Sequence, residues 1–176
     1  MKENTLKTLT DEHESLQIKL RSQVVSIVSV LGDKGLTLGF AESCTGGLLS
    51  SYFTELSGVS KVFWGSIISY DNSVKQKFLN VSEEALKTKG AVSAEVATQM
   101  ATSAQAGLGV SISVAVTGIA GPTGGTPTKP VGTVFIAVAG VKSEVQVFEH
   151  HFSGDRKSVQ LQTCIEAVKH LNDFIL

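Results

Sequence analysis

Small polar residues with reactive side chains follow an apolar run early in the chain. Residues 36–47 read Leu-Thr-Leu-Gly-Phe-Ala-Glu-Ser-Cys-Thr-Gly-Gly, so a predicted strand gives way to a polar cluster at Glu42. Apolar residues then recur at helical spacing, which places this cluster between a strand and a helix. The free N–H groups at a helix N-terminus favour an anion or a developing oxyanion. Ser43 is therefore a candidate nucleophile.

Ser43 and Lys75 each have a simpler explanation. A serine before a helix is more often a cap, and a lysine is usually solvated. Residues around Ser43 form neither a Gly-x-Ser-x-Gly elbow, because Ala41 stands two residues earlier, nor a Walker A loop, because no Gly-Lys-Ser/Thr follows. If the strands before Ser43 and Lys75 are parallel neighbours, however, both residues emerge at one carboxyl edge, where ligands collect.

The histidines form no recognised metal-binding pattern in the sequence. His150 and His151 are adjacent on a predicted strand, so their side chains point to opposite faces and cannot share one ion without distortion. Around His13 and His170, no Asp, Glu or Cys at ligand spacing forms a recognised metal pattern. We therefore expect no metal ion and no cofactor.

Composition favours one soluble domain that binds a small molecule. The 176 residues are 42% hydrophobic and 18% charged, enough for a single core. A net charge of −1 leaves no basic excess, which argues against a nucleic-acid partner. Two cysteines are too few for a disulfide framework, the N-terminus lacks a secretory signal pattern, and no apolar run reaches membrane-spanning length. We expect a cytoplasmic protein without a membrane partner.

The order of predicted elements indicates an α/β fold, a three-layer α/β/α sandwich around a mixed β-sheet. Residues 1–15 are expected to form a flexible N-terminal extension, and residues 16–176 a single domain. Helices are predicted over 16–31, 46–57, 73–78, 82–89, 93–106 and 155–176, and strands over 36–41, 61–70, 111–116, 132–139 and 144–152. The last two strands form a hairpin that turns near Gly140. Its exposed edge leads us to expect a homodimer or higher homo-oligomer.

A long segment rich in Gly, Pro and Thr, residues 117–130, separates the third and fourth predicted strands. Such a composition is typical either of a flexible connector or of a ligand-binding loop.

Six blocks of the sequence, in the same order, resemble one family. They are Ala41-Glu-Ser-Cys-Thr-Gly-Gly47, Tyr70-x-Asn72-x-x-Lys75, Gly90-Ala-Val-Ser93, Thr117-Gly-Ile-Ala-Gly-Pro-x-Gly-Gly125, Lys129-Pro-Val-Gly-Thr133 and Phe152-x-Gly154-x-Arg156. Together they are similar to the nicotinamide-nucleotide amidase family, to which the C-terminal domain of the competence/damage-inducible protein CinA is related. The likeness runs from about residue 16 to the end of the chain.

The resemblance implies hydrolysis of the carboxamide of nicotinamide mononucleotide to nicotinate mononucleotide and ammonia, a step in pyridine-nucleotide recycling. It also implies that Ser43 and Lys75 form the catalytic pair, with Tyr70 beside them. We expect substrate contacts from Glu42, Cys44, Thr45, Gly46, Gly47, Asn72, Thr117, Gly118, Ile119, Ala120, Gly121, Gly132 and Arg156. N–H groups near Thr45 and Gly46 would hold the oxyanion, and Arg156 with the loop at 117–125 would bind the phosphate.

Two other functions fit the same residues. One is a nucleotide-binding or partner-docking module, linked to competence or the DNA-damage response, without turnover. The other is an amidase for a different small carboxamide. Many relatives carry a separate pyrophosphatase-like domain before this one, and 176 residues are too few to include it, so we expect that activity to be missing.

Overall fold

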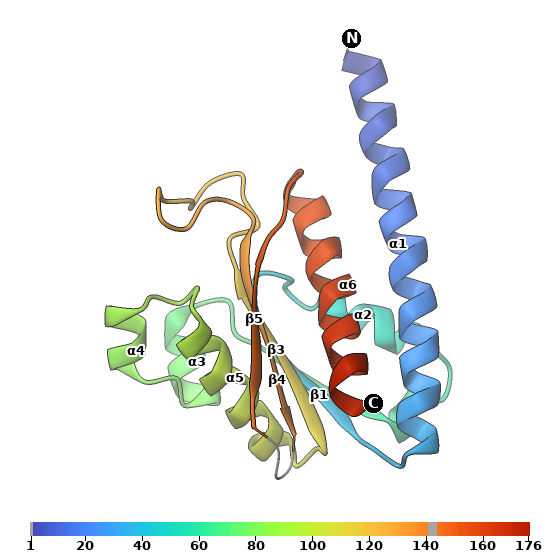
Figure 1. The fold of residues 1–176 in the computed structure, drawn as a ribbon, viewed down its shortest axis with the longest axis vertical. Coiled ribbons are helices and arrows are strands. Elements are labelled where there is room, and N and C mark those ends of the chain that lie inside the picture. Colours follow the sequence, from blue (N-terminus) through green and yellow to red (C-terminus); the bar gives the residue numbers. More distant parts are fainter. Residues whose placement is uncertain (1, 141–143) are drawn as a thin grey trace.

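A five-stranded sheet forms the centre of the computed structural model, which describes residues 2–140 and 144–176 (Figure 1). The strands are β1 (Leu38–Glu42), β2 (Phe63–Ile68), β3 (Ile112–Gly118), β4 (Thr133–Gly140) and β5 (Gln146–His151), in the spatial order β2-β1-β3-β4-β5. Strand β1 pairs parallel with β2 and β3, whereas β4 pairs antiparallel with β3 and β5. The predicted mixed sheet is confirmed.

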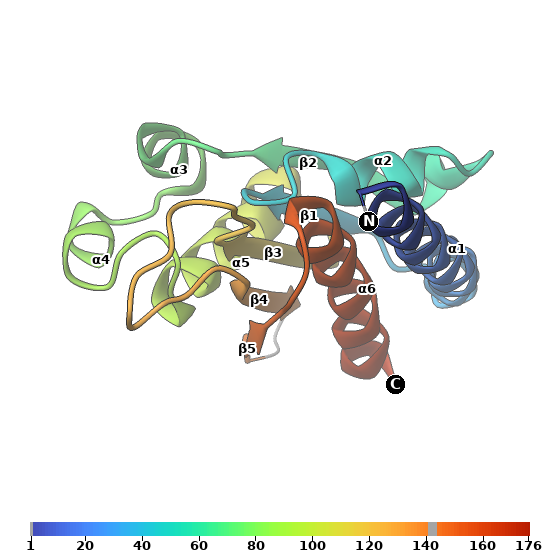
Figure 2. The ribbon, with the colours of Figure 1, turned by 90° about the horizontal axis from the view of Figure 1, so that it is seen from above.

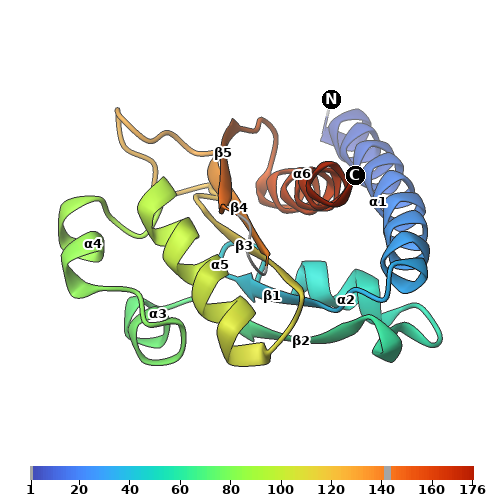
Figure 3. The same ribbon diagram turned by 60° about the horizontal axis from the view of Figure 1, so that its bottom comes forward.

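Helices cover both faces of the sheet, which confirms the three-layer arrangement (Figures 2 and 3). One side holds α1 (Lys2–Asp33), α2 (Leu48–Thr54) and α6 (Arg156–Ile175). The other side holds α3 (Asn72–Leu79), α4 (Glu83–Thr88) and α5 (Ala94–Leu108), and a short 3₁₀ helix, η1 (Val59–Lys61), precedes β2. Helix α6 packs on β3 and β4, whereas α1 packs mainly on α6 and α2 and forms an outer layer.

Alternation along the strands separates two hydrophobic cores. On β3, Val114 and Val116 face the core under α1, α2 and α6, and Ala115 faces the core under α5. The first core contains large side chains such as Phe40 and Phe53, whose ring centroids are 5.0 Å apart. The second consists largely of small side chains, which let α5 approach the strands closely; examples are Ala41, Ala97, Ala101, Ala115 and Ala137.

Helix α1 begins earlier than the sequence predicts. The segment 1–15 is predicted to be a flexible extension, but its described part belongs to α1, which starts at Lys2. No Gly or Pro precedes Gly32, and Lys, Glu and Leu favour the helix, so propensity carries it past the region of apolar periodicity. His13 also contacts Asp155 just before α6, with 2.9 Å between Nε2 and Oδ1.

The antiparallel pairing of β4 and β5 agrees with the predicted hairpin, whereas residues 141–143, beside the turn predicted near Gly140, lie outside the described residues. Every helix within 2–140 and 144–176 is too short or too polar for a bilayer span.

Candidate active site

The carboxyl ends of β1, β2 and β3 lie at one edge of the sheet. Glu42, the last residue of β1, pairs with Ile68 on β2 and Val116 on β3. The N–H of Ser69 then donates to the Glu42 carbonyl at 2.7 Å, and that of Ser43 to the Val116 carbonyl at 3.1 Å. The segments that follow the three strands therefore start side by side.

Glu42 organises the loop that follows β1. Its side chain has no exposed surface, and its carboxylate oxygens accept six hydrogen bonds. The donors are the N–H groups of Gly47, Leu49 and Ser50 and the hydroxyls of Thr45, Ser50 and Ser66. Apart from the close contact with the Ser50 hydroxyl, the distances lie between 2.8 and 3.4 Å. Glu42 thus supplies the acceptors that the first N–H groups of α2 would otherwise lack.

Ser43 and Lys75 are in direct contact. Ser43 Oγ and Lys75 Nζ are 2.9 Å apart, and the two residues are 8% and 1% exposed. The Lys75 amine also donates to the Ser69 carbonyl at 2.5 Å and lies 3.4 Å from the Tyr70 carbonyl oxygen. Asp71 caps α3, so that Lys75 lies in its first turn and reaches back to the strand ends. The two side chains that the sequence placed at one edge are brought together.

Burial shifts the proton affinity of Lys75 and Cys44 in opposite directions. It lowers the pKa of Lys75 below its ordinary 10.5, and this effect outweighs the opposing attraction of the Asp71 carboxylate. Burial raises the pKa of the Cys44 thiol to about 12. Cys44 is therefore protonated near neutral pH and a poor nucleophile, which leaves Ser43 as the better candidate.

Tyr70 and Arg156 meet above the site from different elements. Tyr70 is 61% exposed, and its hydroxyl accepts from Arg156 Nη2 at 2.6 Å. Nη1 of the same guanidinium donates to the Gly121 carbonyl at 2.8 Å. A guanidinium has five N–H donors, so others remain for an anionic ligand after these two contacts.

A cavity of about 180 Å³ opens beside Ser43 and Lys75. Its walls are Ser43, Cys44, Tyr70, Asn72, Lys75, Ala91, Val92, Thr117, Gly118, Ala120 and Arg156. Sequence reasoning named all of these as site residues except Ala91 and Val92. Both belong to the Gly90–Ser93 block, but short apolar side chains carry no chemical signal of a ligand, so only the block's resemblance to the family pointed to them.

The other residues with an expected substrate contact support the walls and do not line this cavity. They are Glu42, Thr45, Gly46, Gly47, Ile119, Gly121 and Gly132. The N–H of Gly46 donates to the Ser43 carbonyl at 3.1 Å, so an oxyanion would have to displace that bond. The N–H of Thr45 has no backbone acceptor in the part of the chain that the structure describes. Their contacts with substrate stay predictions.

Two backbone hydrogen bonds close the base of the loop between β3 and β4. Ile119 N–H donates to the Thr133 carbonyl at 2.9 Å, and Gly132 N–H donates to the Ile119 carbonyl at 2.8 Å. Gly132 has a φ of +93°, and a Cβ at this position would overlap the carbonyl oxygen of Phe152. Only glycine fits there without a backbone shift.

Comparison with known proteins identifies relatives over most of the chain. Residues 20–175 match the CinA C-terminal domain family. A CinA-like protein from Dictyoglomus turgidum is 47% identical over 150 residues, which cover 85% of this chain and 36% of that protein. A CinA-like protein from Nostoc punctiforme is 57% identical over 116 residues, covering 66% of this chain and 28% of that protein. The chain thus spans about a third of the length of these curated relatives.

Solved structures share the fold. The competence/damage inducible protein CihA from Agrobacterium tumefaciens matches with a TM-score of 0.88 at 36% identity, covering 90% of this chain and 96% of that chain. A competence-damaged protein (CinA) superfamily protein from Escherichia coli matches with a TM-score of 0.84 at 32% identity, covering 88% and 90%.

Glu42→Gln should destabilise the protein, because one acceptor oxygen becomes an NH₂ group that faces N–H and hydroxyl donors. We expect the free energy of unfolding, measured in urea, to fall by about 2–3 kcal/mol. Glu55→Gln is the matched control: Glu55 is exposed, pairs with Arg21 at 3.0 Å and should change stability by less than about 1 kcal/mol. Equally small effects of both substitutions would show that Glu42 does not organise this loop.

Proposed function

Because the chain belongs to the CinA C-terminal domain family, we propose that it is an amidohydrolase that converts nicotinamide mononucleotide to nicotinate mononucleotide and ammonia. The observation that carries the proposal is the 2.9 Å contact between Ser43 Oγ and the buried Nζ of Lys75. The substrate is inferred from the resemblance of the six sequence blocks to nicotinamide-nucleotide amidases.

The surroundings of Lys75 favour a neutral amine whose lone pair points at Ser43. A neutral amine has two N–H groups and one lone pair, and the carbonyls of Ser69 and Tyr70 are two acceptors for the N–H groups. The lone pair then accepts from the Ser43 hydroxyl at 2.9 Å. Burial lowers the pKa of Lys75, which increases the neutral fraction near neutral pH. Lys75 is thus suited to take the proton as the serine oxygen attacks.

The reaction divides into two steps with the same base. Ser43 Oγ attacks the carboxamide carbon while its proton passes to Lys75 Nζ, and the N–H of Thr45 is available to the oxyanion. Lys75 returns the proton to the leaving nitrogen, and the C–N bond breaks. Ammonia is released, and the acyl group stays on Ser43 as an ester. Water then attacks the ester with Lys75 as base, which releases the carboxylate and restores the serine hydroxyl.

The proposed role of Arg156 is to bind the phosphate of the nucleotide. Arg156 lines the cavity at Ser43 and also a neighbouring cavity of about 420 Å³, whose walls include Lys157 and Gln160. A substrate with its carboxamide at Ser43 and its phosphate in the second cavity would pass the guanidinium, whose planar N–H groups suit phosphate oxygens. The Lys157 ammonium adds a second positive charge beside this cavity.

Ammonia release tests the activity. The substrates are nicotinamide mononucleotide, its riboside, nicotinamide and unrelated amides, with Ser43→Ala as the background. We expect the mononucleotide to be hydrolysed fastest, because the compounds without phosphate lose the contacts with Arg156. Tight binding of the mononucleotide without ammonia release would instead indicate the non-catalytic binding module. Faster release from another amide would assign a different substrate.

Lys75→Arg should fold but carry a permanent positive charge, and it should lose at least about 100-fold in kcat, because a guanidinium cannot accept the serine proton. Lys77→Arg is the matched control, an exposed lysine on the same helix that should keep full activity. Ammonia release and circular dichroism measure the two properties. A folded Lys75→Arg protein with near-normal activity would show that Lys75 is not the base.

The same base fixes the sign of the pH dependence. Only the neutral lysine accepts a proton, so kcat/KM should rise as the pH rises through the pKa of Lys75 and level off above it. Because burial lowers this pKa, the rise should be centred below 10.5. A flat or falling wild-type profile over that range would contradict the mechanism.

Arg156→Ala should weaken catalysis on the mononucleotide far more than on the riboside. A charge-assisted contact to phosphate is worth about 1.5–3 kcal/mol, which corresponds to roughly a 10–100-fold loss in kcat/KM. Arg21→Ala removes an exposed arginine of α1 and should leave kcat/KM for both substrates unchanged. Equal losses for the two substrates would give Arg156 a structural role through Tyr70 and Gly121.

A further inference from the structure

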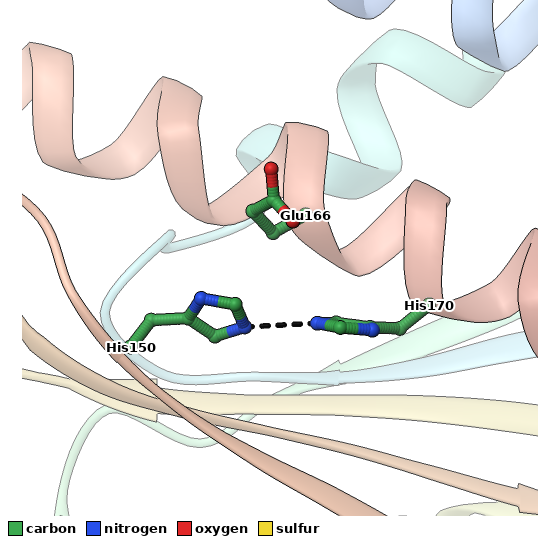
Figure 4. A group of neighbouring side chains, drawn as sticks. All are labelled: His150, Glu166 and His170. Atoms are coloured by element: carbon green, nitrogen blue, oxygen red, sulfur yellow. Dashed lines mark hydrogen bonds between the residues drawn. The ribbon is translucent and has the colours of Figure 1, made fainter.

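A second group of ligand-type side chains lies between β5 and α6 (Figure 4). It consists of His150 on β5 and Glu166 and His170 on α6, and one ligand atom of each lies within 4.8 Å of the others. Strand β5 is the edge strand, separated from β1 by β4 and β3. The group shares no residue with the cavity at Ser43.

The two imidazoles face each other through their Nε2 atoms, which are 2.9 Å apart. Packing fixes the orientation of both rings. His170 stacks on Phe148 with 3.6 Å between centroids and 3° between planes, and His150 stacks on Phe152 at 5.1 Å and 9°. Burial lowers the pKa of both histidines, which favours the neutral imidazole, the form that binds metal ions.

Glu166 adds an oxygen ligand from the same helix face as His170. The two residues are four positions apart, so their side chains lie one turn from each other. Figure 4 shows the Glu166 side chain above the contact between the rings. The Glu166 side chain is 23% exposed, and its carboxylate lies 3.7 Å from the exposed Lys169 ammonium, a loose pair that leaves the carboxylate free to turn toward an ion.

We propose that His150, Glu166 and His170 form a binding site for a divalent transition-metal ion, with Zn²⁺ as the ion that fits best. Two histidines and a glutamate with water in the fourth position are an established ligand set for Zn²⁺. Two nitrogens held at 2.0–2.1 Å by a tetrahedral ion lie roughly 3.3 Å apart, so the rings must separate by about 0.4 Å from the 2.9 Å contact. The proton shared between the rings moves to Nδ1 of its own ring, and both Nε2 lone pairs then face the ion.

A bound ion would join the closing helix to the edge strand. His150 and His170 come from different elements, so the complete site exists only in the folded protein. Binding to the folded state alone raises stability by mass action.

Titration of metal-free protein with Zn²⁺, and separately with Co²⁺, tests the site. We expect one equivalent of either ion to bind, and we expect bound Co²⁺ to show the visible d–d absorption of a four-coordinate ion. Tm should rise by roughly 5–10 °C when the free metal is about a hundredfold above Kd. His150→Gln and His170→Gln should each lower the affinity at least about tenfold. His151→Gln is the matched control, since its exposed ring pairs with Glu149 at 3.3 Å, and it should bind like the wild type.

Absence of binding by the wild type would overturn the proposal, as would equal losses in His150→Gln and His151→Gln. Unchanged affinity in Glu166→Gln would exclude the three-ligand site. If a histidine variant does not fold, the Co²⁺ spectrum of the wild type decides. A thiolate-to-cobalt charge-transfer band would assign the ion to Cys44 or Cys164, whereas its absence supports the histidine site.

Discussion

The buried amine of Lys75 is the constraint around which the strand ends are arranged. A buried amine is tolerated when its hydrogen-bonding groups find partners: Lys75 donates to the Ser69 carbonyl, and burial lowers its pKa, which favours the neutral form. Parallel pairing of β1 with β2 brings Ser43 and the Ser69 carbonyl to one edge, and the Asp71 cap starts α3 where its first turn faces them. The same burial that surrounds the amine lowers its pKa, as the proposed role of Lys75 as a base requires, so the packing and the proposed chemistry have a common cause.

Neighbouring polar residues at the end of β1 have separate roles because side chains alternate along a strand. Glu42 turns toward α2, where its oxygens accept hydrogen bonds from the loop and from Ser50. Ser43 turns toward α3 and meets Lys75. The position of Ser43 therefore depends on a carboxylate that takes no part in the proposed reaction, and a change at Glu42 would act on the proposed activity through the loop.

Periodicity and turn chemistry predicted the strands and most of the helices, but not the first half of α1. They placed Ser43 and Lys75 at one edge only if the two preceding strands were parallel neighbours, and the pairing itself came from the resemblance to the family. They could not give the role of Glu42, since the rotation of the loop decides whether its oxygens face a ligand or a helix. The apolar side chains of Ala91 and Val92 suit a cavity wall and a hydrophobic core equally well, so their residue types do not distinguish the two. Similarly, Glu166 and His170 meet His150 only after α6 is packed across the sheet. In the sequence, His150 was considered as a metal ligand only together with His151, so this group was not predicted.

The closed base of the loop between β3 and β4 has a consequence for how the protein can diversify. Ile119 is hydrogen-bonded to both Gly132 and Thr133, so the two ends of the loop are held together whatever lies between them. The entropy of closing such a loop changes slowly with its length, by about 0.6 kcal/mol for each doubling. Insertions and deletions at 122–131 should therefore change the free energy of folding little. They can reshape the neighbouring cavity, which Pro122 and Val131 line, while Ser43 and Lys75 stay in place.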